Sequence, residues 1–155
     1  MTRMGAVITL AEEIPAPPDR VRRFYVDLNN IRLVHPLVVS VRTVGRIETA
    51  DGYVQTYRVT DRIPLGRFML RTTYTARLHV PVHGDVVTEA RQFPMVRLHG
   101  VVSFDEIDGG ARIVERLRIQ APRLLATVTT REAVHAHTKM LSNIREHFAG
   151  RPPAG

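Results

Sequence analysis

Three ionisable side chains fall on stretches of the sequence that are otherwise apolar, and these are the candidates for chemistry. Glu115 alternates with Ile113 and Leu117 in a strand pattern, so it shares their face. His137 lies in an apolar helical stripe, where an imidazole can shuttle protons or hydrogen-bond a ligand carbonyl. Asp61 takes an inward position near a predicted strand end. Because such groups can act as general acids and bases near neutral pH, we take Glu115, His137 and Asp61 as candidate catalytic residues.

Each of these side chains also has a purely structural interpretation. Glu115 can pair with an arginine or lie near a solvated rim. Asp61 can cap the turn at 64–66, and His137 can be a hydrogen-bonded core histidine. Another histidine, His35, precedes a proline, and we expect it to fix the shape of that corner.

Tyrosine and apolar side chains on the same faces predict a ligand cavity. Tyrosine hydroxyls can reach a polar group on a ligand, although the same residues can instead pack in the core and bond a backbone group. The candidate ligand-binding residues are Tyr53, Tyr57, Tyr74, Leu98, Leu117, Val134, Met140 and Leu141.

The sequence offers no metal or cofactor motif. Cysteine is absent, which excludes disulfides and thiolate metal sites. His135 and His137 are two residues apart in a predicted helix, so they point about 200° apart and cannot chelate one ion together. No glycine-rich phosphate loop or Ser-His-Asp spacing is present. We therefore expect no metal and no cofactor.

The net charge of +7 suggests nucleic-acid binding, but the placement of the charges argues against it. The arginines are scattered and often adjoin acids, as in Asp19-Arg20 and Glu115-Arg116. We expect a basic outer surface and no nucleic-acid partner. No apolar run approaches the roughly 20 residues of a membrane span, and the first residues lack the apolar core of a signal peptide. A cytoplasmic protein without a membrane span is the expectation.

Secondary-structure signals place the candidate residues on strands and helices. A strand pattern covers 6–14, and a proline-rich stretch ends it. Pro18 opens a helix with one apolar stripe. We expect Asn29-Asn30 to break this helix, and 31–34 to add about one more turn.

Six more strands and a long helix follow. Short turns join the strands, which predicts an antiparallel meander with one apolar face and one arginine-rich face. The helix has apolar residues at three- and four-residue spacing, so this stripe should face the sheet. Residues 1–150 would form a single domain and 151–155 a disordered tail. The predicted strands are 38–49, 53–63, 67–80, 86–93, 96–104 and 111–120, and the predicted helix is 124–148.

Three segments resemble a known superfamily. The stretch 14–37 looks like the start of SRPBCC proteins, which include polyketide cyclase/dehydrase and lipid-transfer proteins. The segments 61–66 (DRIPLG) and 109–116 (GGARIVER) are similar to a strand end and a glycine hairpin of bacterial members. The resemblance covers 5–148. It implies the α+β helix-grip fold, a seven-stranded antiparallel sheet wrapped around a long C-terminal helix, with two short helices after the first strand.

The resemblance also implies a function. It favours binding of a small hydrophobic, polyketide- or lipid-like molecule between the sheet and the C-terminal helix, by a monomer or homodimer. One alternative is a cofactor-independent cyclase/dehydratase-type enzyme that uses the acid–base residues, and another is a partner-binding module. Aromatic polyketide cyclases of this fold are generally described with an inward arginine on a mid-sheet strand and an inward histidine on the last strand. The inward residues at comparable places here look like Thr72, Tyr74 and Ala76 on the mid-sheet strand and Leu117 on the last strand, which offers Glu115 in place of a histidine. This departure argues against aromatic ring formation.

Overall fold

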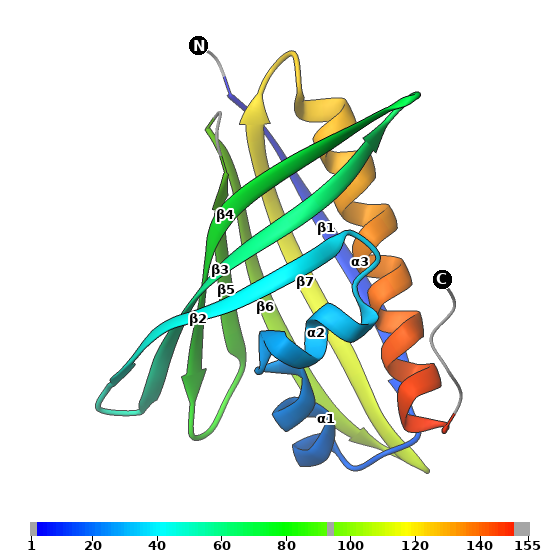
Figure 1. Ribbon diagram of the computed structural model, residues 1–155. Helices are drawn as coiled ribbons and strands as arrows, with labels where there is room; N and C mark the ends of the chain where they lie inside the picture. Colours follow the sequence, from blue (N-terminus) through cyan, green and yellow to red (C-terminus); the bar gives the residue numbers. More distant parts are fainter. Residues whose placement is uncertain (1–2, 93–94, 151–155) are drawn as a thin grey trace.

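Seven strands form one antiparallel sheet that curves around a long helix in the computed structural model, which describes residues 3–92 and 95–150 (Figure 1). The strand order is β1-β7-β6-β5-β4-β3-β2, so consecutive strands are neighbours except that β1 pairs with β7. The predicted helix-grip architecture is confirmed. The elements are β1 (Arg3–Ile14), α1 (Pro18–Tyr25), α2 (Leu28–Val34), β2 (Val38–Glu48), β3 (Gly52–Leu65), β4 (Phe68–Pro81), β5 (Val86–Gln92), β6 (Val96–Ile107), β7 (Gly110–Pro122) and α3 (Ala126–Phe148).

The β6–β7 hairpin shows why the sheet can close against β1. Gly109 has a φ of 80°, which favours glycine in this two-residue turn. Its neighbour Gly110 needs its small size, because a Cβ there would lie 2.0 Å from the backbone oxygen of Ile14. The two glycines predicted to form a hairpin thus also allow β7 to pass close to the end of β1.

The break between the first two helices lies earlier than predicted. Asn29-Asn30 belongs to α2, and the chain turns at Val26-Asp27 instead. Asp27 is the N-cap of α2, and its carboxylate accepts a hydrogen bond from the backbone N–H of Asn29 at 2.9 Å. The cap therefore outweighs the weak helix propensity of the asparagines, and the prediction of a break at Asn29-Asn30 was wrong.

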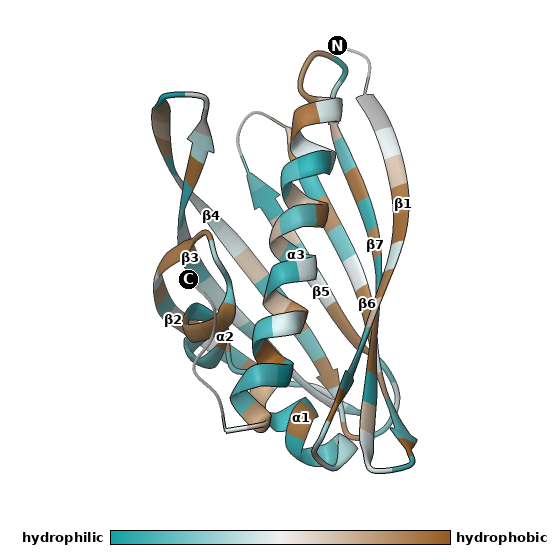
Figure 2. Cartoon of the chain, turned by 90° about the vertical axis from the view of Figure 1, so that its right-hand side faces the viewer, coloured by the Kyte–Doolittle hydropathy of each residue, from teal (hydrophilic) through white to brown (hydrophobic). Residues whose placement is uncertain are grey.

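The long helix α3 lies across the concave face of the sheet and contacts β1, β7 and α2. It begins two residues later than predicted, after a turn in which the N–H of Leu125 donates to the oxygen of Pro122. Its inward residues Ala136, Met140 and Ile144 are buried. Hydrophilic positions recur along its outward face (Figure 2). No helix in the described part of the chain is long and apolar enough to cross a membrane.

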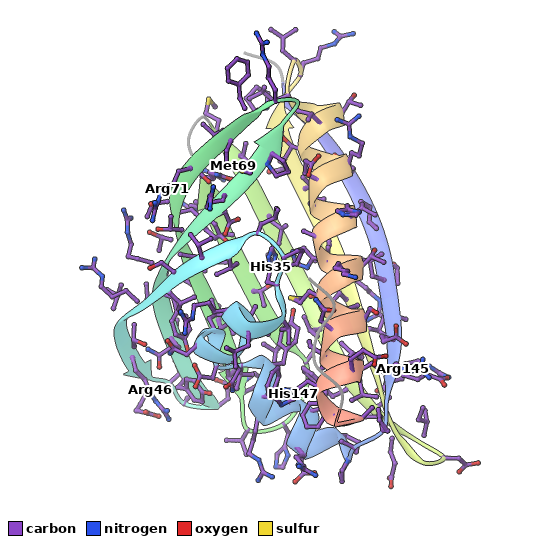
Figure 3. All side chains as sticks on the ribbon, turned by 45° about the vertical axis from the view of Figure 1, so that its right-hand side comes forward. His35, Arg46, Met69, Arg71, Arg145 and His147 are labelled. Atoms are coloured by element: carbon purple, nitrogen blue, oxygen red, sulfur yellow. The ribbon has the colours of Figure 1, made fainter. Side chains whose placement is uncertain are left out.

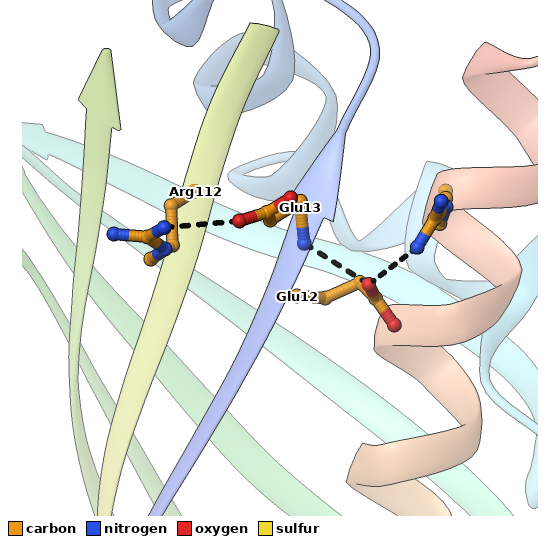
Figure 4. A network of polar contacts seen from close by, with 4 residues as sticks. Glu12, Glu13 and Arg112 are labelled. Carbon is orange, nitrogen blue, oxygen red and sulfur yellow. Dashed lines mark hydrogen bonds and ion pairs between the residues drawn. The ribbon is translucent and has the colours of Figure 1, made fainter. Parts of the chain in front are cut away.

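Surface ion pairs link the first strand to its neighbours (Figure 4). Arg112 of β7 donates to Glu13 at 2.9 Å, and Arg145 of α3 donates to Glu12 at 3.2 Å. Exposed pairs of this kind typically contribute less than about 1 kcal/mol each. They align β1 with β7 and α3, while the core holds the sheet and helix together.

The two short helices fill only one end of the curved sheet. In Figure 1, α1 and α2 lie together at the lower end, and α3 runs down to them from the upper end. The Asn143 side chain fixes this junction by donating to the backbone oxygen of Val34 at 2.8 Å. The space between sheet and α3 beyond α2 remains for the cavity described next.

Candidate functional site

A cavity of about 320 Å³ lies between the sheet and α3. Its wall is mainly apolar and comes from strands β2–β7, from α3 and from the region of α1 and α2. Its volume falls within the range of about 300–1,000 Å³ usual for small-molecule sites. Representative apolar lining residues are Val59, Ala76, Leu78, Ile119, Ala136 and Met140.

A carboxylate behind the cavity wall holds His137 in place. Glu115 of β7 has no exposed surface, and its Oε1 lies 3.1 Å from Nδ1 of His137 on α3. The hydroxyl of Tyr25, on α1, donates to Oε2 of the same carboxylate. Glu115 therefore pairs with a histidine and a tyrosine in place of the arginine considered from the sequence, and it has no exposed surface.

This arrangement leaves one nitrogen of His137 for a ligand. His137 lines the cavity, whereas Glu115 does not. With Nδ1 engaged by the carboxylate, Nε2 has no hydrogen-bond partner among the described residues. Glu115 thus fixes the orientation of the His137 ring from the side away from the cavity, as a carboxylate fixes the imidazole in many catalytic sites.

Burial and electrostatic interactions with Glu115 determine the protonation states of His137 and Tyr25. Burial alone lowers the pKa of His137, but the charge and hydrogen bond of Glu115, with the charge of Asp61, outweigh burial and raise it. Burial, followed by the charge and hydrogen bond of Glu115, raises the pKa of Tyr25. The phenol thus stays protonated and donates, while the imidazole is held as a cation to a higher pH than a free histidine.

A second polar group lies on the sheet side of the cavity. Asp61 of β3 is only 8% exposed, and Tyr74 of β4 donates to its Oδ1 at 3.4 Å. Burial raises the pKa of Asp61 to about 6, against the hydrogen bond from Tyr74 and the charge of His137. The carboxylate makes no bond to the 64–66 turn, so its proposed role as a turn cap does not hold in the structure.

Thr72 adds an unsatisfied hydroxyl to this polar group. It lies directly opposite Asp61 in the β3–β4 register and lines the cavity. Its Oγ1 is buried without a hydrogen-bond partner among the described residues. Buried polar atoms are normally paired, so this hydroxyl is suited to a polar atom of a ligand.

His35 closes the cavity wall between the two groups. It points from the end of α2 toward α3 (Figure 3), and its ring lies 5.7 Å from that of His137. Its Nδ1 accepts from the N–H of Leu37 at 3.1 Å, which fixes the pre-proline corner as expected. Burial and the charge of His137 lower the pKa of His35 to about 3, so the ring is neutral and does not compete for the proton.

The structure divides the predicted ligand-binding residues into two groups. Tyr74, Leu98 and Met140 line the cavity. The other five lie outside the lining, among them Tyr57, which packs at the junction of α1 and α2. The residues outside the lining are Tyr53, Tyr57, Leu117, Val134 and Leu141.

Local contacts show what these residues do instead. The Tyr57 hydroxyl donates to the backbone oxygen of Val26 at 3.4 Å, at the junction of α1 and α2. The Tyr53 ring lies 3.8 Å from the guanidinium carbon of Arg46. Leu117 and Leu141 are almost completely buried, and Val134 is half-buried on α3. Their direct contact with a ligand stays a prediction.

Two residues of the site were missed as candidates from sequence. Tyr25 belongs to the apolar stripe of α1, and a tyrosine in such a stripe signals a hydroxyl that needs a buried partner. Thr72 is an inward polar residue opposite Asp61, but alternation alone does not show whether its hydroxyl is satisfied. Neither pattern identifies a site residue until the strand or helix that faces its hydroxyl is known.

Comparisons with known proteins bear on the family and on the fold. A sequence model of the family described as polyketide cyclase/dehydrase and lipid transport matches residues 6–149. No match was found among curated protein sequences. Many solved structures share the fold at low sequence identity, which supports the architecture alone.

Three of these structures illustrate the range. TTHA0849 from Thermus thermophilus is 19% identical with a TM-score of 0.75, over 94% of this chain and 98% of that one. The Zhui aromatase/cyclase from Streptomyces sp. R1128 is 15% identical with a TM-score of 0.68, over 96% and 99%. The di-domain aromatase/cyclase BexL of the BE-7585A biosynthetic pathway is 15% identical with a TM-score of 0.76, over 96% of this chain and 51% of that one.

Proposed function

The chain belongs to the polyketide cyclase/dehydrase and lipid transport family, and on this premise we propose that it binds a small, mainly apolar molecule in the cavity between the sheet and α3. The observation that carries the proposal is a largely apolar cavity of about 320 Å³ with oriented polar groups on two of its walls. An apolar body would fill the cavity, while an oxygen atom of the ligand would accept from His137. A hydroxyl of the ligand would bond Asp61 and Thr72.

A cavity-filling substitution tests this proposal. Ala133 lines the cavity from α3, and Ala133→Phe should occupy the space and weaken binding of an environment-sensitive apolar dye at least about tenfold. Thr138→Phe is the matched control, because Thr138 is exposed on the same helix. Thermal melts check that both variants fold. Equal dye affinity for the two variants would contradict binding in this cavity.

A second candidate function, acid–base catalysis on the bound molecule, is favoured by the placement of His137 and Asp61. One is on the helix side of the cavity and the other on the sheet side, and both line it. Both pKa values are raised, that of Asp61 to about 6 by burial and that of His137, against burial, by the charge of Glu115, so near neutral pH the Asp61 carboxylate can act as the base and the His137 imidazolium as the acid.

The proton balance of such a step is simple. Asp61 as a carboxylate would remove a proton from the carbon next to a ligand carbonyl, and His137 as imidazolium would protonate the carbonyl oxygen, which gives the enol. With a hydroxyl on the next carbon, His137 would instead protonate that leaving group, and water would depart with formation of a carbon–carbon double bond. Glu115 would act through His137 as a positioning residue, since it does not reach the cavity.

Deuterium exchange distinguishes catalysis from binding alone. The hydrophobic ketone 2-tetralone can be incubated with the protein in deuterated buffer, and exchange next to its carbonyl followed by NMR. We expect faster exchange than in buffer, and loss of the acceleration in His137→Asn and in Asp61→Asn, a loss typically of ~100-fold or more for such groups. Exchange at the buffer rate, with dye binding intact, would leave a binding protein only.

A further inference from the structure

Exposed apolar side chains gather at the mouth of the cavity. Leu70 lines the cavity and is 45% exposed, so the cavity reaches the surface beside it. Phe68 and Met69 precede it on the β3–β4 hairpin, Met95 precedes β6, and Leu124 precedes α3. We call these five residues the rim. They lie on three connections at the same end of the molecule, opposite to α1 (Figure 1).

The rim differs from the rest of the surface. Its members are 45–93% exposed, and Leu124 is the most exposed of them. Elsewhere in the described residues, the exposed large apolar side chains are valines and an isoleucine, apart from Leu33. Met95 also has a φ of 61°, the one positive φ of a described non-glycine residue. A methionine in this conformation is costly, which indicates that an apolar side chain is needed there.

Arginines are concentrated in the segments that carry the rim. The segments 62–71, 91–97 and 120–128 contain six arginines and no Asp or Glu. None of these arginines forms an ion pair within the described part of the chain. The six arginines are Arg62, Arg67, Arg71, Arg91, Arg97 and Arg123.

Two pairs of these arginines are direct cross-strand neighbours. Arg62 lies opposite Arg71 on β3 and β4, and Arg91 lies opposite Arg97 on β5 and β6. Like charges directly opposite each other destabilise a sheet. Figure 3 shows Arg71 close to Met69 on the upper part of β4, so the positive charge adjoins the rim. An anionic partner would relieve this repulsion.

We propose that the rim docks on an anionic lipid surface, with its apolar side chains inserted and the surrounding arginines at the headgroups. Three connections with long, exposed apolar side chains match a lipid interface, which has no fixed shape. Arginine can place its stem along apolar surface and its guanidinium among anionic headgroups. In this orientation the cavity mouth faces the bilayer, so an apolar ligand passes between membrane and cavity without crossing water.

Vesicle flotation tests the proposal with the intact chain. Phosphatidylcholine vesicles are compared with vesicles of equal parts phosphatidylcholine and phosphatidylglycerol. We expect flotation with the anionic vesicles, weakened by salt. The rim variant Phe68→Ser/Met69→Ser/Leu124→Ser should lower partitioning at least about tenfold. Arg67→Gln/Arg123→Gln should lower it ~30-fold, from about 1 kcal/mol per arginine near such a surface.

Matched variants at other positions keep the test specific. Ile47→Ser/Val82→Ser replaces apolar side chains of similar exposure at the opposite end, and Arg32→Gln/Arg42→Gln removes the same charge away from the rim. Both should float like the wild-type protein. Thermal melts and dye binding should be unchanged in all four variants, because the replaced side chains are exposed. Dye binding also separates this proposal from the proposed function, which does not require a membrane.

Three results would overturn the inference. In the first, the protein binds dye but does not float with anionic vesicles. In the second, it floats equally with phosphatidylcholine and with mixed anionic vesicles, and in the third, the rim and control variants lose flotation equally. The first result, combined with salt-sensitive binding to an acidic carrier protein through the rim, would assign the rim to a protein partner.

Discussion

The contact between Glu115 and His137 makes a precise prediction for the substitution Glu115→Gln. Glutamine has nearly the same shape, and its side-chain oxygen can still accept from Tyr25. What it removes is the negative charge beside His137. Because Glu115 has no exposed surface, no solvent screens the change.

The pKa of His137 determines how the stability of the Glu115→Gln variant changes with pH. In the wild-type protein this pKa is raised above 6.5, the value of a free histidine. The pair therefore stabilises the fold fully below about pH 6.5, and the stabilisation is lost as the pH rises through the folded-state pKa. Without the carboxylate, burial is the largest influence and lowers the pKa of His137. In the variant, stability should instead be lost as the pH falls below about 6.5.

The size of the loss should thus depend on pH. Breaking a buried pair costs about 3–5 kcal/mol, and the retained hydrogen bond from Tyr25 offsets part of it. Each unit by which the substitution lowers the pKa of His137 adds about 1.4 kcal/mol to the loss of stability at acidic pH. We expect the free energy of unfolding to fall by about 3 kcal/mol near pH 5.5. Toward pH 9 the charged fraction of His137 falls in both proteins, so the loss of stability should shrink to about 1 kcal/mol or less.

Urea unfolding at the two pH values measures this difference, and NMR titration of the His137 ring gives its pKa directly. Glu106→Gln is a matched control, since Glu106 is an exposed glutamate of β6. It should change stability by no more than about 0.5 kcal/mol at either pH. An equal loss at both pH values for Glu115→Gln, or an unaltered titration of His137, would refute the electrostatic account of the pair.

Other substitutions test the remaining polar contacts. Tyr25→Phe removes one donor to the buried Glu115 carboxylate and should destabilise by about 1–3 kcal/mol in urea unfolding; no change would mean that the hydroxyl contributes nothing. Thr72→Val keeps the shape and removes an unpaired hydroxyl, so thermal melts should show equal or higher stability; a clear loss would reveal a partner for that hydroxyl. The pKa of Asp61 is raised from 3.8 to about 6, so the folded state loses stability as the pH rises from about 4 to above 6. Asp61→Asn should therefore stabilise by about 3 kcal/mol near pH 7.5 and by much less near pH 4, as measured by urea unfolding at both pH values; the same gain at both would contradict the buried carboxylate.

Periodicity in the sequence placed the main ionisable residues correctly. Alternation in β7 put Glu115 on the inward face, and helical spacing in α3 put His137 toward the sheet, so their meeting was expected from the order of the elements. The same alternation put Asp61 inward on β3. These predictions depend only on local backbone geometry, which a strand or helix pattern determines.

Long-range packing explains what periodicity missed. Alternation places Tyr57 and Tyr74 on the same face of the sheet, but α1 and α2 cover the lower half of that face and leave the upper half open. Only the path of the chain after β1 decides which tyrosine packs in the core and which lines the cavity. The tyrosine partner of Glu115 was missed for the same reason, because Tyr25 comes from a helix about ninety residues earlier in the chain.

The polar groups of the cavity are difficult to explain by stability alone. A buried ion pair such as Glu115–His137 can often be replaced by apolar residues with no loss of stability. The isolated hydroxyl of Thr72 and the buried carboxylate of Asp61 each cost free energy in the empty protein. Among the described residues Asn143 also has a buried unpaired side-chain atom, but its amide nitrogen joins α3 to α2. The polar groups that contribute nothing evident to stability thus lie around one cavity, which is the distribution expected of a ligand-binding site.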